Sequence, residues 1–522
     1  MRSRLRTTLA AGASAALAAT VLVSTPALAG GGHHGGGHGH GAAGDRQLQQ
    51  YAEDTWQSFV AMTDDRTGLP ADLIEGDLTA PSVNTSPTNI GGYLWSAVVA
   101  RDLGIIDKRE ARQRIEQTLD TLESLERHEP SGQFYNWYSI HDGSKLTTWP
   151  GSGDVVHPFL SSVDNGWLAA SLRVVAGADR KLAKQADALY ESMDFCWYHD
   201  TEAADGAGLN RGGFWVDQPG DTCTIPGNYS GDGSGDVLYT CHHYDTTVSE
   251  ARIATYLGIA NGQIPESAYY ATYRTMPESC YFGWQEQKPQ GQVVDYDGTQ
   301  TYEGTYGYAG MRLVPSWGGS MFEALMPDLF IPEADWGDDS WAVNHPAFVE
   351  AQRHHGMEEA GYGYWGFSPS SNPIDGYREY GVDAIGIGAE GYASDVESTD
   401  VDLGYEGCRE ATNPSPEFGD GVVTPHASFL ALPYDREAVL DNLSALKTDF
   451  DSYGEGGFYD AIAVGSSTVA ERYLSLDQAM IMAAIGNELS DDSLKDYFVD
   501  RDFERAVRPL VEAQQFGRRL DD

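Results

Sequence analysis

The chain has 522 residues, with 78 Asp and Glu against 33 Lys and Arg, which gives a formal net charge of −45. An acidic surface repels phosphate groups, so nucleic acids and anionic membranes are not expected partners. Aromatic residues make up 11% of the chain, a share that supports a large hydrophobic core and excludes disorder of the chain as a whole.

The N-terminal segment has the pattern of an export signal. Three Arg residues precede an apolar stretch over 9–23, and the sequence Ala-Leu-Ala at 27–29 is typical of a cleavage site. We therefore expect residues 1–29 to be a cleaved signal peptide and the mature chain to be secreted. Residues 30–43 are rich in Gly and His, which predicts a flexible, solvated tail or, alternatively, a weak metal-binding segment.

Residues 44–522 are expected to form a single domain, because no Pro- or Ser-rich linker divides them. Apolar residues recur there at three- and four-residue intervals, which is typical of amphipathic helices. Strand-like alternation is scarce and no repeat period occurs, so the pattern favours a helical toroid over a solenoid. The predicted helices are 45–62, 88–103, 108–127, 162–176, 181–197, 247–260, 319–330, 346–355, 426–432, 436–449, 475–487 and 502–512.

Four predicted helices carry an acidic residue at a position where their pattern predicts a core residue. These residues are Asp164, Glu250, Glu323 and Asp477. An ionised carboxylate is costly to bury unless it is paired or hydrogen-bonded, so several of them from different helices predict an acidic cleft. Glycoside hydrolysis needs such a cleft, because one carboxyl protonates the leaving oxygen while another activates water or attacks carbon.

The loops between the predicted helices are rich in Trp, Tyr and Gly. Sugar rings expose apolar CH faces that stack on aromatic side chains, while polar neighbours bind the hydroxyl groups. The alternative for each aromatic residue is a place in the hydrophobic core. The candidate substrate contacts on these loops are Trp137, Tyr138, Arg211, Trp215, Trp317, Trp365, Arg378 and Tyr380.

The chain has five cysteines, an odd number that in an exported protein predicts up to two disulfides and one thiol. Cys223 and Cys241 flank a Gly/Asp-rich loop and are the pair that we expect to be bonded. Neither a Cys-x-x-Cys nor a His-Glu-x-x-His motif occurs, so no metal centre and no cofactor are predicted. A structural calcium ion in the Asp-bearing loop 232–236 is the alternative.

Seven motifs together resemble the glycoamylase-like family of (α/α)6-barrel carbohydrate enzymes. That family is similar to the endo-β-1,2-glucanases and to a domain of the cyclic β-1,2-glucan synthases. The resemblance runs from about residue 45 to 515, and it implies an all-α (α/α)6 barrel with long aromatic and Gly-rich loops over one face. The motifs are Thr85–Gly91, Phe134–Tyr138, Ser161–Gly166, Asn210–Trp215, Ser249–Arg252, Ser316–Glu323 and Gly376–Gly381.

The resemblance also implies catalytic roles for two residues. Glu250 matches the position of the general acid in the β-1,2-glucanase relatives, and Asp477 matches the segment of their general base. The retaining synthase relatives have His-Gln where this chain has Asp477-Gln478, and they usually carry Glu where it has Pro369-Ser370. Both departures favour an inverting hydrolase over a transferase.

Asp164 and Glu323 would then bind substrate hydroxyls or raise the pKa of Glu250 through like charge. The structural alternatives are a helix cap for Asp164 and a buried pair with an Arg for Glu323 or Glu250. A structural role is also the alternative for Asp477.

The sequence therefore predicts a secreted glycoside hydrolase that acts on a poly- or oligosaccharide, with a β-linked glucan favoured and β-1,2 the leading choice. The alternative is a non-catalytic extracellular carbohydrate-binding protein of the same fold, which would not need Glu250 and Asp477 in one cavity. An epimerase or lyase is a third reading, for which the His pairs 242–243 and 354–355 would be candidates. The sequence predicts no oligomeric state.

Overall fold

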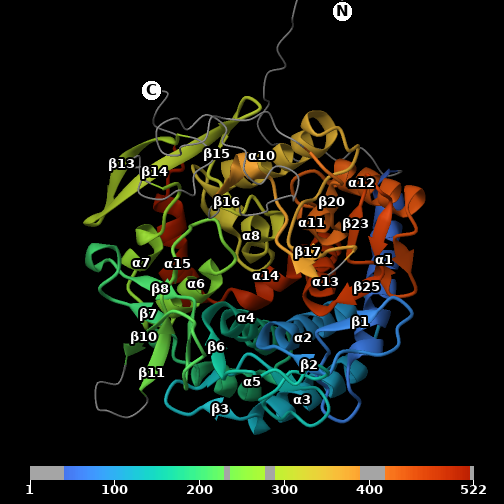
Figure 1. Cartoon of the computed structure of the whole chain (residues 1–522), viewed down its shortest axis with the longest axis horizontal. Helices are drawn as coiled ribbons and strands as arrows, with labels where there is room; N and C mark the ends of the chain where they lie inside the picture. The colour runs from blue at the N-terminus through green and yellow to red at the C-terminus, as the bar shows by residue number, and fades with distance from the viewer. Residues whose placement is uncertain (1–39, 228–235, 277–287, 375, 388–417, 518–522) are drawn as a thin grey trace, which may run out of the picture. The chain divides into compact units, whose positions relative to one another are not determined.

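The computed structural model describes residues 40–227, 236–276, 288–374, 376–387 and 418–517 (Figure 1). The predicted signal peptide, most of the Gly/His tail and most of the candidate calcium loop lie outside these residues. Contacts along the chain group Gly44–Asp522 into one compact unit. In the described ranges, no helix is long and apolar enough to cross a membrane.

Six helices form the centre of this unit, and each of them contacts its neighbours. Helix α4 packs against α2 and α6, while α13 packs against α2 and α11, and α11 packs against α8. The guanidinium of Arg252 on α6 donates to the backbone carbonyls of Glu323 and Ala324 on α8, which closes the circuit. The six helices can be followed from blue to red in Figure 1: α2 (Pro87–Asp102), α4 (Ser162–Ala178), α6 (Arg252–Ala260), α8 (Met321–Leu325), α11 (Pro425–Leu430) and α13 (Ser475–Leu489).

A second set of helices flanks the first. Helix α3 packs on α2, α5 on α4, α15 on α6, α10 on α8 and α12 on α11. Helix α1 (His40–Met62) contacts α2 and α11 through aromatic rings, with centroids 6.0 Å apart for Trp56 and Tyr93 and 5.8 Å apart for Tyr51 and Phe429. The bounds of the others are α3 (Lys108–Ser124), α5 (Ala183–Glu191), α10 (Trp341–His354), α12 (Arg436–Asp449) and α15 (Arg501–Ala513).

Burial separates the two sets. Helix α2 is buried along nearly its whole length and consists mainly of apolar and small residues, whereas α3 buries one stripe and exposes charged residues on its other side. Trp95 of α2 and Trp167 of α4 both contact Phe330, with ring centroids 5.1 and 5.8 Å away. These rings fill the space between the central helices.

All twelve predicted helical segments contain helix, but several bounds differ. Helix α6 begins at Arg252 and not at 247, because Val248 forms a parallel β-bridge with Ser316 and a turn follows it. The segment predicted over 319–330 divides into α8 and a 3-10 helix (Pro327–Leu329), since Pro327 cannot donate a helical hydrogen bond.

Other bounds differ at helix ends. Helix α10 begins at Trp341, so Pro346 lies inside it and not at its start. The segment 181–197 divides into α5 and a 3-10 helix (Phe195–Tyr198), and α1 begins at His40, within the predicted tail. Three short helices had no clear signal: α7 (Ser267–Ala271), α9 (Glu333–Trp336) and α14 (Ser493–Phe498).

The expectation of an all-α domain is correct for the helical framework and misses many short strands. Six antiparallel or parallel pairs connect loops around the helix ends. They are β1 (Leu73–Glu75) with β25 (Arg472–Leu474), β2 (Asn84–Thr85) with β5 (Tyr138–Ser139), β3 (Arg127–His128) with β4 (Gln133–Phe134), β16 (Ser316–Trp317) with β19 (Gly386–Ile387), β17 (Ser370–Ser371) with β18 (Tyr377–Arg378), and β21 (Tyr453–Gly454) with β22 (Gly457–Phe458). Of these pairs, β16–β19 is parallel.

Three larger sheets contain three strands each, in the orders β12-β8-β7, β13-β14-β15 and β20-β23-β24. The longest strands, β13 and β14, form an antiparallel hairpin. The strand bounds are β7 (His199–Asp200), β8 (Leu209–Arg211), β12 (His243–Tyr244), β13 (Gln290–Tyr296), β14 (Thr299–Tyr308), β15 (Met311–Leu313), β20 (Val422–Val423), β23 (Ala461–Ala463) and β24 (Thr468–Ala470).

A four-stranded antiparallel sheet, ordered β10-β11-β9-β6, leads directly into α4. Its last strand ends at Ser161, the residue that caps α4. Cys223 and Cys241 form a disulfide beside the pair of Thr224 and Thr240, so the bond joins the ends of two neighbouring strands. The strands are β6 (Phe159–Ser161), β9 (Gly213–Trp215), β10 (Thr224–Gly227) and β11 (Val237–Thr240).

Candidate active site

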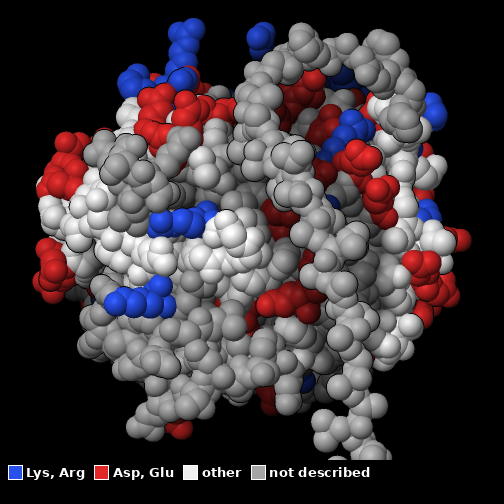
Figure 2. Space-filling model, turned by 90° about the horizontal axis from the view of Figure 1, so that it is seen from above, with Lys and Arg blue, Asp and Glu red and all other residues white. Residues whose placement is uncertain are grey.

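A cavity of about 880 Å³ lies where the first turns of the central helices meet. This volume is within the usual range for ligand sites. The starts of α2, α4 and α13, the segment before α6, and α8 all contribute to its lining. Its carboxylates are Asp72, Asp164, Asp245, Glu250, Glu323, Glu379 and Asp477. Acidic side chains also lie in several groups on the face shown in Figure 2.

Serine caps place three polar residues at this cavity. The hydroxyl oxygens of Ser86, Ser161 and Ser320 accept hydrogen bonds from the backbone N–H groups three residues later, at the starts of α2, α4 and α8. A cap of this kind fixes the first turn of a helix. The residues in the third helical position are Asn89, Asp164 and Glu323, and all three line the cavity.

Glu250 and Glu323 lie side by side in this cavity. The backbone N–H of Glu250 donates to Oε2 of Glu323 at 2.7 Å, and Nε1 of Trp167 donates to Oε2 of Glu250 at 2.5 Å. Burial and the charge of Glu323 raise the pKa of Glu250 well above its usual value. Burial raises the pKa of Glu323 to about 7. Both effects favour the protonated form of Glu250.

The structure does not support the salt bridges considered for these two residues. The guanidinium of Arg252 pairs with Glu333, at 2.7 and 2.8 Å, and not with Glu250 or the carboxylate of Glu323. The role of a helix cap also belongs to another residue, because Ser161 caps α4. The carboxylate of Asp164 instead accepts a hydrogen bond from Thr88 at 2.7 Å.

Asp477 lies in the first turn of α13, lines the same cavity and is 3% exposed. Burial raises its pKa to about 6, against a hydrogen bond from Asp460 that lowers it. The pKa of Asp460 itself is raised well above its usual value by burial and by the charge of Asp477, which favours a protonated Asp460 that can donate to Asp477. Nδ1 of His426 lies 3.0 Å from Oδ2 of Asp477.

His426 is a neutral neighbour of Asp477. Burial lowers its pKa to about 4, so the imidazole carries no charge at neutral pH. Asp477 is therefore mostly ionised at pH 7 without a cation beside it.

Six of the residues predicted for the site line the same cavity. They are Asp164, Glu250, Glu323, Asp477, Trp137 and Trp317. The Trp137 ring packs against Trp149, with centroids 5.1 Å apart. The structure thus brings together all four predicted carboxylates and two of the predicted aromatic residues.

The other six predicted contacts do not line the cavity, and three of these are buried. Trp365 and Tyr380 are 2% and 1% exposed and belong to the hydrophobic core. Tyr138 is also buried, and its hydroxyl accepts from the Tyr135 N–H and donates to a backbone carbonyl. These rings shape the loops from inside, because aromatic side chains contribute more to stability when buried than when exposed.

The remaining three lie on strands beside the cavity. Arg211 forms an ion pair with Asp200, and the Trp215 ring packs on Phe159 with centroids 4.6 Å apart. Arg378 is exposed. Its two sequence neighbours line the cavity, and side chains of successive residues in a strand point to opposite faces.

Sequence reasoning missed several lining residues. Asp72 accepts a hydrogen bond from Asn89 at 2.7 Å, and burial raises its pKa. Burial also raises the pKa of Asp245 to about 6. The repeated Ser-x-x-polar spacing at three helix starts could have identified Asn89. Asp72 and Asp245 lie on irregular segments, where no periodic signal exists.

The candidate histidine pairs do not form an acid–base couple. His242 and His243 line the cavity, but Nε2 of His243 lies 2.9 Å from a carboxylate oxygen of Asp200, which holds the ring. His354 and His355 do not line the cavity.

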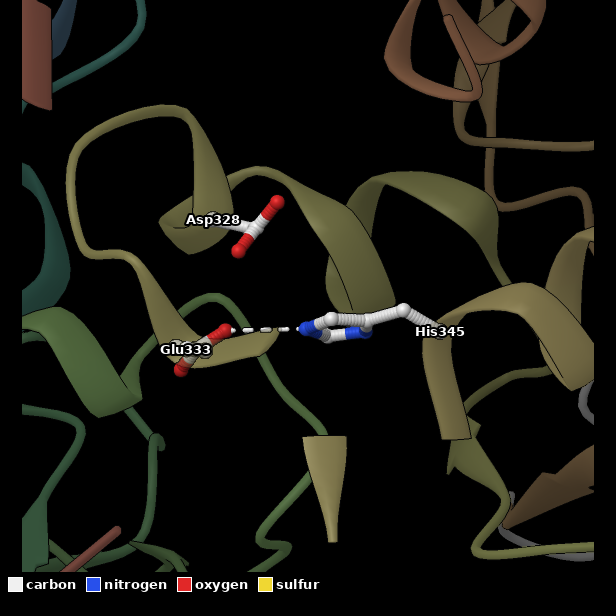
Figure 3. Close-up of side chains that lie close together, drawn as sticks. All are labelled: Asp328, Glu333 and His345. Carbon is white, nitrogen blue, oxygen red and sulfur yellow. Dashed lines mark hydrogen bonds and ion pairs between the residues drawn. The ribbon is translucent and has the colours of Figure 1, made fainter. Parts of the chain in front are cut away.

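One group of potential metal ligands occurs among the described residues: Asp328, Glu333 and His345 (Figure 3). Both carboxylate oxygens of Glu333 already accept hydrogen bonds from Arg252, and Nε2 of His345 lies 3.2 Å from one of them. Nζ of Lys495 lies 3.6 Å from Asp328. A metal cation would lie beside two positive charges, so this donor set fits a buried ion-pair network.

Two family models match this chain. Residues 242–501 match a family described as "putative glucoamylase", and residues 50–220 match a family described as a protein of unknown function (DUF3131). The resemblance to the glycoamylase-like family is confirmed. The first model covers Glu250, Glu323 and Asp477, and the second covers Asp164.

A cyclic β-(1,2)-glucan synthase, NdvB of Rhizobium meliloti (strain 1021), is 24% identical to the chain over 568 residues. The match covers 90% of this chain and 18% of the synthase, so the chain spans less than a fifth of that relative's length.

Two solved structures show the shared fold. An endo-β-1,2-glucanase from Chitinophaga pinensis, in complex with sophorotriose and glucose, has a TM-score of 0.61 at 16% identity, covering 90% of this chain and 98% of its own. A β-1,2-glucanase from Parabacteroides distasonis has a TM-score of 0.63 at 16% identity, covering 90% of this chain and 60% of its own.

Proposed function

We propose that the chain is a glycoside hydrolase that cleaves a β-1,2-linked glucan with inversion at the anomeric carbon. The observation that carries the proposal is that Glu250 and Asp477 line one cavity and have different neighbours there. The pKa of Glu250 is raised well above its usual value, and that of Asp477 is raised to about 6. A carbohydrate-binding protein has no need of two buried carboxyls with different pKa values. An acid–base pair requires that difference.

Glu250 is the proposed general acid. Burial and the neighbouring Glu323 charge both favour the protonated form of its carboxyl by raising its pKa. It would donate this proton to the glycosidic oxygen as the bond breaks. The Trp167 indole N–H holds the carboxyl in place through its hydrogen bond.

Asp477 is the proposed general base. A carboxyl with a pKa of about 6 is ionised at pH 7 but remains basic enough to take a proton from water. The Asp477 carboxylate would remove this proton directly or through a short relay of hydroxyl groups. An inverting enzyme leaves room for the water, with its carboxyls about 6.5–9.5 Å apart.

The rest of the lining would bind the sugar chain. Asp164 and Glu323 would accept hydrogen bonds from sugar hydroxyls, and Trp137 and Trp317 would stack on the sugar rings. The assignment of β-1,2 linkage rests on the relatives, since two of them are described as β-1,2-glucanases and one as a cyclic β-(1,2)-glucan synthase.

We also propose that the six central helices are the inner ring of an (α/α)6 barrel and that the flanking helices are its outer ring. The contacts around the circuit support this architecture. Export through residues 1–29 remains part of the proposal, and it would place the enzyme outside the cell, where it would meet glucans.

The test is hydrolysis of a panel of glucans by the purified chain, with products separated by thin-layer chromatography. The panel contains β-1,2-, β-1,3-, β-1,4-, mixed-linkage and α-linked glucans, and Glu250→Gln is run beside the wild type. We expect oligosaccharides from β-1,2-glucan that the variant does not produce. Retention of a glucan in an affinity gel without any hydrolysis would contradict the proposal and favour a binding protein.

A further inference from the structure

The guanidinium of Arg252 is buried directly behind the two acidic residues Glu250 and Glu323. Arg252 is 6% exposed, and its side chain makes five hydrogen bonds. Nη1 donates to the backbone carbonyls of Ser249 and Glu323, both at 2.9 Å, and Nη2 donates to the carbonyl of Ala324 at 2.7 Å. One planar group thus holds the backbone next to Glu250 and the backbone of Glu323 itself.

A buried carboxylate keeps this guanidinium in position. Nε and Nη2 of Arg252 donate to the two oxygens of Glu333 at 2.7 and 2.8 Å, a two-point contact with fixed geometry. Tyr256 donates to the same carboxylate at 2.8 Å, and His345 lies 3.2 Å from it (Figure 3). The Trp341 ring lies 4.6 Å from the guanidinium carbon. These contacts together fix the position of the Arg252 guanidinium.

We propose that Arg252 is a positioning residue that fixes the spacing of Glu250 and Glu323 by clamping the backbone beneath both. The inference rests on the proposed function, in which Glu250 is the general acid. The contact that the clamp sets is the 2.7 Å hydrogen bond from the Glu250 N–H to the Glu323 carboxylate. Since Arg252 lies behind the backbone and does not line the cavity, it does not touch substrate.

The clamp has a consequence for the protonation of Glu250. Bringing two carboxyls together disfavours ionisation of both, so loosening the clamp lets Glu250 ionise at lower pH. Other groups also act on the Glu250 carboxyl from the elements around it, and they stay in place when the clamp is loosened. They are Asp164 and Trp167 on α4, Tyr244 on β12 and Tyr377 on β18.

The test removes the clamp and its counter-charge together, as Arg252→Met with Glu333→Met. Because the pair has no net charge, its removal leaves no buried charge unpaired. The charge of Arg252 also lowers the pKa of Glu250, so this double variant is used for kcat and KM, and the pH dependence is measured in a variant that keeps the charge. Arg252→Lys is the second variant, since an ammonium retains the charge but cannot reach both carbonyls and Glu333 with a planar fork.

The chain offers a matched control. Arg274 and Glu303 form another buried pair, 0% and 1% exposed with Nε and Oε1 3.3 Å apart, and neither residue lines the cavity. Arg274→Met with Glu303→Met should destabilise the fold to a similar degree. Thermal unfolding of all variants sets an assay temperature at which each is folded.

We expect kcat on β-1,2-glucan to fall about 100-fold in both Arg252 variants, the cost of about 1 Å of misplacement at a reacting group. KM should stay within about threefold, because the lining that binds sugar is retained. In Arg252→Lys, which keeps the charge, the basic limb of the pH profile should move to lower pH by about one unit. The control pair should leave kcat and the pH profile unchanged.

A second readout does not depend on hydrolysis. Carbodiimide labels a protonated carboxyl, so the pH dependence of Glu250 labelling, measured by peptide mass spectrometry, follows its ionisation. Labelling should end at lower pH in Arg252→Lys than in the wild type and the control pair. Equal labelling profiles in all proteins would overturn the inference. If the labelling profile differs between wild type and variant as expected but the wild type hydrolyses no glucan, only the proposed function is overturned.

Discussion

Glu250 and Asp477 are carboxyls of the same cavity, and different neighbours set their pKa values. Glu250 lies against Glu323, and a fully paired guanidinium supports the backbone of both. Asp477 lies between neutral His426 and Asp460, with no Lys or Arg among the contacts described for it. Burial and like charge together raise the pKa of Glu250, whereas a hydrogen bond from Asp460 lowers the pKa of Asp477 against the effect of its burial.

Burial alone does not determine which of the two carboxyls acts as the acid and which as the base. Burial is the largest cause of the raised pKa at both Glu250 and Asp477. What separates the two residues is the next neighbour: an ionisable Glu323 beside one, and a proton-donating Asp460 beside the other. Substitutions of these neighbours should therefore change the difference between the pKa values of Glu250 and Asp477.

Glu250→Gln should have the largest effect. The amide keeps the shape and can still accept the hydrogen bond from Trp167, but it has no proton to give to the glycosidic oxygen. We expect kcat to fall by about 10²–10⁴-fold in a variant that is folded at the assay temperature, as checked by thermal unfolding. Retention of more than about a tenth of wild-type activity would remove Glu250 from the role of acid.

Asp477→Asn tests the proposed base. Asparagine cannot accept a proton from water, so kcat should fall by about 10²–10³-fold while substrate binding is retained. Isothermal titration with a β-1,2-linked oligosaccharide measures the binding. If the variant hydrolyses glucan at a rate near that of the wild type, another carboxylate of the lining, such as Asp72, is the base.

Asp460→Leu should move the pH profile with less loss of rate. The hydrogen bond from Asp460 favours ionised Asp477, so its removal raises the pKa of Asp477. Because the base must be ionised, the acidic limb of kcat, expected near pH 6, should move to higher pH by about one unit. Asp460→Asn keeps a donor and serves as the control, whose profile should stay close to that of the wild type. If the acidic limb is unchanged in Asp460→Leu, Asp460 does not control the pKa of Asp477.

Glu323→Gln should have the smallest effect on rate. It should move the basic limb of the pH profile to lower pH, because the charge beside Glu250 is lost, and it should also change stability. The pKa of this buried carboxyl is raised to about 7 in the folded state, from about 4.5 when unfolded, so its contribution to stability is present below pH 4.5 and is lost as the pH rises through 7. The variant should therefore be more stable than the wild type by about 1–3 kcal/mol at pH 8 and no more stable at pH 4. Urea unfolding at both pH values measures this, and equal differences at the two would contradict it.

Much of the helical framework could be predicted from the sequence. Periodicity placed α12 at its observed bounds and located the starts of α3, α4 and α13 to the residue. At α3, α4 and α12 a capping side chain agrees with the apolar spacing. The same reasoning put Glu250 on a helix face, whereas it lies in the turn before α6. The chain there follows a β-bridge to a distant segment, which local spacing does not record.

The candidate site was predictable where an acid interrupted an apolar pattern, as at Asp477 on α13. The sequence carried no signal for residues that contact the catalytic carboxyls or their backbone without lining the cavity. Arg252 and Asp460 owe their places to contacts 70 to 90 residues away in sequence, with Glu323 and Ser371. The prediction that Trp365 and Tyr380 contact substrate was wrong, because these rings stabilise the loops by burial in the core.

The most direct test of the central claim is the anomeric configuration of the first product, followed by proton NMR during hydrolysis of β-1,2-glucan. If Glu250 protonates the leaving oxygen while Asp477 activates water on the opposite face, the new reducing ends appear as the α-anomer and convert to the β-anomer later. Initial appearance of the β-anomer would mean that a carboxylate attacks the sugar, and would contradict the assignment of Asp477 as a base.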